Sequence, residues 1–268
     1  MTEISAQAKR PCHVGLFVTC LVDLFRPSVG FASIKLLQDA GCTVSVPEMQ
    51  TCCGQPAFNS GDKKNAQDIA RKVIKNFIDF DYIVVPSGSC AGMLKCHYPE
   101  LLAEDKVWSE KANTLSKKVF ELTSFLVDIL DVKDVQANCA QSVTYHDSCA
   151  GLRELKIKQQ PRQLLNSVQD LSLREMPDSE VCCGFGGTFC VKYSDISNSI
   201  VQRKADRVLE TGADIVLAGD MGCLMNIAGK LSKDKCLTKE GKPIAVRHVA
   251  EVLANMTDES FICEGGKP

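Results

Sequence analysis

Eight cysteines, spaced alike in the two halves of the chain, are the residues most suited to chemistry. The first set is Cys20, Cys52, Cys53 and Cys90, and the second set is Cys149, Cys182, Cys183 and Cys223. Equivalent cysteines lie 129, 130 and 133 positions apart, and a glycine follows each adjacent pair. Soft thiolates select iron–sulfur clusters, zinc or copper(I), and four thiolates are the number that a cubane cluster needs. We therefore expect one [4Fe–4S] cluster in each half.

Zinc is the rival metal, and the spacing argues against it. Structural zinc sites favour cysteine pairs separated by about two to four residues, and none of the eight cysteines shows that spacing. A zinc-stabilised interaction module remains an alternative. Cys96 and Cys190 lie near the two sets in sequence, and packing is the preferred interpretation for them, with a ligand role left open.

Glycines accompany the cysteine pairs and are expected to approach the clusters. Gly54 and Gly184 follow the pairs directly, and Gly186 and Gly187 extend the second one into a glycine-rich loop. A glycine backbone can come close to inorganic sulfide because it carries no Cβ. The loop does not have the G-x-G-x-x-G spacing of a dinucleotide site. It therefore predicts backbone wrapped around a cluster.

Composition narrows the compartment and the partners. The chain has 268 residues, 45% of them apolar, with a formal net charge of −2 and 15 cysteines, an odd number that rules out complete disulfide pairing. Residues 1–10 have no apolar core of the kind that a signal peptide needs, and no apolar run is long enough to cross a bilayer. We expect a cytoplasmic protein with reduced thiols and no membrane span. Near-neutral charge makes nucleic acid an unexpected partner.

Hydrophobic patterning predicts two similar α/β units. Short β-rich runs predict strands at 13–18, 43–46 and 82–85 in the first half and at 143–146, 171–175, 214–218 and 244–246 in the second. Helical periodicity marks 27–40, 62–80, 161–168, 194–210 and 248–256. We place the first unit at 11–135 and the second at 140–260. Residues 101–130 are expected to form a helical stretch on the outside.

The predicted strands give the cysteines a common position. Each member of the first set follows a predicted strand, and the second set repeats the order. The carboxyl ends of parallel strands meet at one sheet edge, where doubly wound folds bind ligands. The expected fold is therefore two pseudo-repeated, Rossmann-like units with parallel sheets and a cysteine cluster at the carboxyl ends of the strands of each.

Three polar residues beside Cys149 are the weak candidates for catalysis. Arg153 suits bidentate binding of a carboxylate, and His146 suits proton transfer near neutral pH. Asp147 lies between His146 and the cysteine. The favoured interpretation of His146 is a hydrogen bond to a cluster sulfur or a loop carbonyl, ahead of catalysis.

The motifs together resemble a known family, the cysteine-rich CCG proteins, and most closely the lactate utilisation protein A group. The resemblance rests on QTCCGQPA at 50–57, PSGSC at 86–90, YHDSC at 145–149, CCGFGGTF at 182–189 and DMGCLMN at 220–226. It implies an iron–sulfur electron-transfer subunit of a complex that oxidises L-lactate to pyruvate. It also implies a ferredoxin-type iron–sulfur protein and a third small subunit as partners. The subunit is expected to be inactive alone.

One departure separates the chain from the related catalytic subunit of heterodisulfide reductase. There the last motif of each half is Cys-x-x-Cys, whereas this chain has Met93 and Asn226 at the second of those positions. Four patterned cysteines per half favour ordinary four-ligand clusters. A heterodisulfide-reductase-like catalytic subunit is kept as an alternative function.

Overall fold

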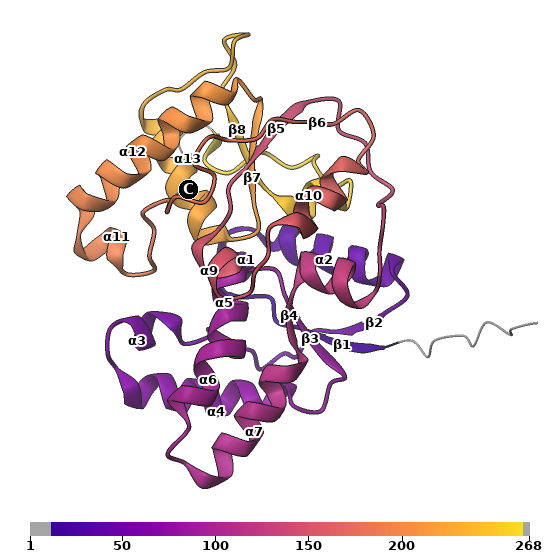
Figure 1. Ribbon diagram of the computed structural model, residues 1–268, viewed down its shortest axis with the longest axis vertical. Helices are drawn as coiled ribbons and strands as arrows, with labels where there is room; N and C mark the ends of the chain where they lie inside the picture. The colour runs from indigo at the N-terminus through magenta and orange to yellow at the C-terminus, as the bar shows by residue number, and fades with distance from the viewer. Residues whose placement is uncertain (1–11, 265–268) are drawn as a thin grey trace, which may run out of the picture.

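Two parallel four-stranded sheets form the framework of the molecule (Figure 1). The computed structural model describes residues 12–264, so the segment 1–10 and the proposed first residue of the first unit lie outside the described residues. The first sheet contains β1 (His13–Leu16), β2 (Thr43–Ser45), β3 (Tyr82–Val85) and β4 (Val119–Glu121) in the order β2-β1-β3-β4. The second contains β5 (Ser142–Tyr145), β6 (Ser172–Leu173), β7 (Ile215–Ala218) and β8 (Ala245–His248) in the order β6-β5-β7-β8. The α/β prediction with two repeated units is confirmed.

Helices cover the sheets and join their strands. The first half contains α1 (Cys20–Phe25), α2 (Pro27–Asp39), α3 (Gln55–Asn59), α4 (Lys63–Phe77), α5 (Gly88–Gly92), α6 (Tyr98–Leu101), α7 (Lys106–Lys118) and α8 (Leu122–Ser124), with π-helical turns at Met93–His97 and Phe125–Ile129. The second half contains α9 (Cys149–Arg153), α10 (Gln159–Asn166), α11 (Phe189–Lys192), α12 (Ser194–Thr211), α13 (Met221–Lys233) and α14 (Val249–Leu253). No helix within residues 12–264 has the length and apolar character needed to cross a membrane.

The prediction of a helical stretch over residues 101–130 was wrong at 119–121. The stretch contains α7, but the chain then extends into β4, which pairs with β3 through Ile83↔Val119. Val119 and Glu121 are buried in this three-residue edge strand. Apolar residues on both sides continue a helix-like pattern across the strand, and pairing with β3 overrides that local preference.

The apolar core joins the two halves. Residues of α1 and α2 belong to the same buried cluster as residues of α10, α13 and α14, and α14 packs on α2. A second buried cluster lies under α4, α6 and α7 and includes Phe17, Cys53 and Cys90. Figure 1 shows α5 and α9 between the two sheets. Packing between the halves therefore fixes the orientation of one sheet relative to the other.

Candidate metal centres

The patterned cysteines all lie beyond the carboxyl ends of strands. Cys20 begins α1 after β1, and Cys149 begins α9 after β5. Cys90 and Cys223 lie in the first turns of α5 and α13, which follow β3 and β7. These four cysteines follow strands as predicted, and each lies in the first turn of a helix, whereas the adjacent pairs lie in loops.

In the first set, the four thiols converge. The Sγ atoms of Cys20 and Cys52 are 3.8 Å apart, and the neighbouring thiols of Cys52 and then Cys90 raise the pKa of Cys53. Thiol contacts from Cys20 and then Cys53 lower the pKa of Cys52 to about 2, while the same contact raises the pKa of Cys20. Like charges this close cannot all ionise without a compensating cation. The set is therefore arranged for a metal centre.

The second set repeats this geometry. The neighbouring thiol of Cys149, followed by that of Cys183, lowers the pKa of Cys182 to about 2, and the pKa of Cys149 is raised in turn. Cys183 also lies within hydrogen-bonding range of Cys223. The thiols of Cys183 and Cys223 and a ring nitrogen of His146 all lie within 4.8 Å of one another.

Backbone amides face the sulfurs in both halves. The Gly54 amide N lies 3.5 Å from the Sγ of Cys52, and the Gly184 amide N lies 3.3 Å from the Sγ of Cys182. Both glycines have positive φ, +83° and +85°. A Cβ on Gly184 would stand 2.8 Å from the Ser197 carbonyl oxygen of α12. These positions need glycine because their φ is positive and the neighbouring helix leaves little space for a Cβ.

The other two glycines predicted to bind the cofactor line a cavity beside the second set. Gly186 and Gly187 have φ of +54° and +65° and line a cavity of about 370 Å³ with Cys149, Cys182, Cys183 and Cys223. Cys190, on α11, directs its thiol to the Gly187 carbonyl oxygen at 3.4 Å, and Cys96 is exposed. The packing interpretation of Cys190 agrees with that contact.

The carbonyls of the buried cysteines have different partners in the two halves. The Tyr98 hydroxyl donates to the Cys53 carbonyl at 2.9 Å, and the Asn226 side-chain amide donates to the Cys183 carbonyl at 2.8 Å. Asn226 therefore holds the second cysteine loop through the Cys183 carbonyl.

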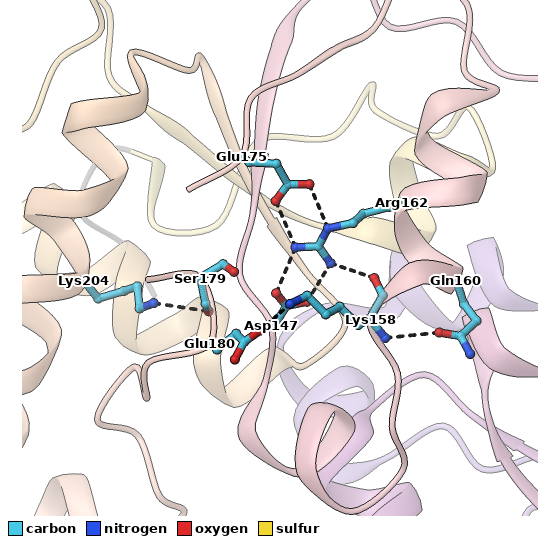
Figure 2. Close-up of polar contacts among 8 residues, drawn as sticks. All are labelled: Asp147, Lys158, Gln160, Arg162, Glu175, Ser179, Glu180 and Lys204. Carbon is cyan, nitrogen blue, oxygen red and sulfur yellow. Dashed lines mark hydrogen bonds and ion pairs between the residues drawn. The ribbon is translucent and has the colours of Figure 1, made fainter. Parts of the chain in front are cut away.

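Of the three catalytic candidates, Asp147 is committed to an ion pair (Figure 2). Both of its carboxylate oxygens accept from Arg162 at 2.9 Å, and the arginine also binds Glu175 at 2.8 and 3.0 Å. Asp147 is 2% exposed and Arg162 is 8% exposed. The pair fixes the strand-to-helix segment that leads into Cys149.

His146 is buried beside the second set, whereas Arg153 lines a cavity next to it. The His146 ring is fully buried and makes no well-formed hydrogen bond within residues 12–264, although the Ser179 backbone lies close enough to raise its pKa. Burial, followed by the nearby Lys204, lowers the pKa of His146 to about 4, so the ring is neutral at physiological pH. Arg153 lines the cavity of about 370 Å³. The structure brings His146, but not Asp147, to the cysteines.

Lys204 is a neighbour of the second set that motif reasoning missed. It is 2% exposed, and its ammonium donates to the Asp178 carbonyl at 2.7 Å and to the Ser179 carbonyl at 3.3 Å; Figure 2 shows the contact with Ser179. Burial lowers the pKa of Lys204, and the nearby Cys183 opposes that shift. The sequence did carry one signal: Lys204 falls on the same helical face as the apolar residues Val201 and Val208, which are buried in α12.

The helix α5 of the first half packs directly against α9 of the second half. A Cβ on Gly88 would stand 2.9 Å from the Gly151 Cα, so the helices touch through their backbones. Asp220, at the start of α13, accepts from the Ser89 amide at 2.8 Å across the same junction. The helices that carry Cys90 and Cys149 are thus held in direct contact.

The donor set fits an iron–sulfur cluster in each half. Four thiols in each half would supply the ligands, glycine amides face the sulfurs, and a buried imidazole lies beside the second site. Zinc accepts the same donors. Iron–sulfur is favoured over zinc because none of the eight cysteines has the short pair spacing of structural zinc sites.

Comparison with known proteins identifies the chain's class and then its family. A family model described as a cysteine-rich domain (CCG) matches residues 14–95 and 143–228, so the protein belongs to the class built from paired cysteine-rich domains. Proteins named lactate utilization protein A from Bacillus pumilus and Halalkalibacterium halodurans are 49% and 47% identical to it over 240 residues. These alignments cover 90% of this chain and 98% and 96% of the relatives. The chain belongs to the lactate utilization protein A family.

A solved structure shows the same fold at low identity. A hypothetical protein from Helicobacter pylori matches with a TM-score of 0.64 and 13% identity, over 94% of this chain. This chain spans 50% of the length of that protein's chain. The likeness supports the fold alone.

Proposed function

We propose that the protein is an iron–sulfur electron-transfer subunit of a complex that oxidises L-lactate to pyruvate. The observation that carries the proposal is the convergence of four thiols in each half, repeated at equivalent strand ends. Close relatives are named for lactate utilization. When bound, each [4Fe–4S] cluster supplies one-electron storage. The cysteine-pair loops and the short helices hold the ligands, and the α5–α9 contact sets the two sites side by side.

The proposed role excludes lactate oxidation by this chain alone. Removing hydride from a 2-hydroxy acid is a two-electron step that flavin or nicotinamide normally handles. In a cluster with four cysteine ligands, each iron would be held by one thiolate and three sulfides, which leaves no open position for substrate. We therefore assign the hydride step to the assembly, with a ferredoxin-type iron–sulfur protein and a third small subunit as the proposed partners. In this proposal the chain is the subunit of the oxidoreductase complex that carries electrons.

A catalytic role beside the second set is the second candidate. The cavity of about 370 Å³ is lined by Arg153 and His97 as well as by the cysteines, so a small carboxylate has both space and a cationic partner. Part of that volume would be taken by a cluster. Because Asp147 is bound to Arg162 and His146 is fully buried, Arg153 is the polar candidate that reaches the cavity.

The boundaries of the two units and the compartment belong to the same proposal. Residues 11–135 and 140–260 are proposed as the units, which is supported by the strands of each sheet falling within one range. The cytoplasm is proposed as the compartment, since reduced thiols persist there.

The test uses the clusters as reporters. The chain is purified and reconstituted without oxygen, and its visible absorption is followed after addition of L-lactate, alone and with both partner proteins. The proposal predicts bleaching only in the assembly. Lactate-dependent bleaching of the isolated chain would move catalysis to the cavity, and Arg153→Ala would then decide the site.

A further inference from the structure

The two cysteine sets are matched in geometry but differ at two equivalent buried positions. Phe17 stands three residues before Cys20, and His146 stands three residues before Cys149. Their backbones make the same bond, Phe17 N to the Val84 carbonyl at 2.9 Å and His146 N to the Leu217 carbonyl at 2.8 Å. Both side chains are fully buried. The first half therefore has a phenyl ring where the second has an imidazole.

The second position is on the helix behind each cysteine-pair glycine. A Cβ on Gly54 would stand 3.2 Å from Ile69 of α4, and one on Gly184 would stand 3.2 Å from Ile200 of α12. Four residues after these isoleucines, the first half has Val73, 1% exposed, and the second half has Lys204, 2% exposed. Val73 belongs to the buried cluster that contains Cys53 and Cys90. A methyl-bearing side chain in one half is thus replaced by an ammonium in the other.

His146 is placed to donate into the second site. A neutral imidazole carries an N–H on one of its two nitrogens in either tautomer. Neither nitrogen makes a well-formed hydrogen bond among residues 12–264, although the Ser179 backbone lies close enough to raise the pKa of the ring, and one nitrogen lies within 4.8 Å of the Cys183 and Cys223 sulfurs. A buried donor is destabilising when its hydrogen bond is not well formed. The sulfurs of a bound cluster would supply a further acceptor.

Lys204 places its amino group beside the same site. Its two carbonyl partners, Asp178 and Ser179, hold the ammonium in place without neutralising it. It is close enough to interact electrostatically with Cys183 and Cys149. One-electron reduction adds a negative charge to a buried cluster, and a nearby cation or N–H donor stabilises that charge.

We infer that His146 and Lys204 make the cluster of the second half easier to reduce than that of the first half, and so give electron flow through the subunit a direction. In the internal step, the first-half cluster loses one electron and is oxidised, and the second-half cluster gains it and is reduced. No bond is made or broken. The inference rests on the proposed function, because it requires both sites to hold clusters.

The test is an anaerobic potentiometric titration of the full, iron-loaded chain followed by electron paramagnetic resonance. Two one-electron waves are expected. Cys53→Ser should remove the wave at lower potential, and Cys183→Ser should remove the wave at higher potential. The reverse assignment, or two waves at one potential, would overturn the inference.

Two variants test the residues themselves by giving the second half the first half's apolar character. His146→Phe and Lys204→Met should each lower the reduction equilibrium constant of the second cluster about tenfold, which is about 59 mV for one electron. The first cluster should not change. Lys95→Met is the matched control, since Lys95 also donates to two carbonyls, those of Ser116 and Val119, but belongs to the first half and interacts with Cys96.

The remaining outcomes are distinguishable. Iron should remain in both halves of His146→Phe, and its selective loss from the second half would show that His146 is a ligand and overturn its role as a donor. Unchanged potentials in both variants would overturn the inference while leaving the proposed clusters intact. Absence of iron from the unmodified chain would instead refute the proposed function.

Discussion

Asp147→Asn should destabilise the protein through the ion pair that fixes the second cysteine set. Asp147 accepts both hydrogen bonds of a bidentate pair from Arg162, and the two side chains are 1% and 9% exposed. Removing one partner of a buried ion pair typically costs 3–5 kcal/mol. Glu175, 55% exposed, still binds the arginine in the variant, so we expect the lower end, about 3 kcal/mol.

Glu175→Gln supplies the matched control because it removes the other carboxylate on the same arginine. Its exposure predicts a loss of about 0–1 kcal/mol. The measurement is urea unfolding of the iron-loaded proteins without oxygen, compared through the midpoint at unchanged slope. Asp147→Asn should also release second-half iron at a lower urea concentration. Equal midpoints for the two variants, with equal iron retention, would refute the assignment of Asp147 as the residue that anchors this set.

Three further results are expected. Cys53→Ser and Cys183→Ser should each lose iron from their own half only, as measured by iron content and absorption; loss of all iron from either would indicate one shared centre. Burial raises the pKa of Glu121 from 4.5 to about 7, so the folded state holds a proton that the unfolded chain has lost, and stability should fall as pH rises between these values. In Glu121→Gln, whose amide oxygen can still accept from Thr123 and Ser124, that slope should be weaker, and an unchanged slope in denaturant titrations at several pH values would contradict the shift. The isolated, iron-loaded chain should not reduce a dye with L-lactate, and dye reduction at a useful rate would place catalysis in this subunit.

The repeat of the cysteines made the main architecture predictable. Cysteines that recur after short apolar runs in both halves predict parallel strands with ligands at one edge, because strand order and helix crossover leave few other arrangements. The helices that begin at the cysteines were harder to predict from the sequence. Cys20 and Cys149 begin helices of only six and five residues, which are too short for a hydrophobic period to form.

Features set by long-range pairing were not predictable from local pattern. β4 has three residues, and it is a strand because β3 offers a free edge beside it. Arg162 is a surface-type residue in the sequence, and its burial depends on Asp147 and Glu175 from other elements. Lys204 was visible only as a charge on an apolar helix stripe. Its position beside the cysteines depends on how α12 packs over the Gly184 turn.

Metal analysis of the anaerobically purified chain tests the central claim most directly. Iron and acid-labile sulfide are measured together with zinc, and the visible spectrum is recorded on the same sample. Two four-iron clusters predict about eight irons and about eight sulfides per chain, with broad absorption that bleaches on reduction. Stoichiometric zinc without iron or sulfide, in a colourless and folded protein, would contradict the account.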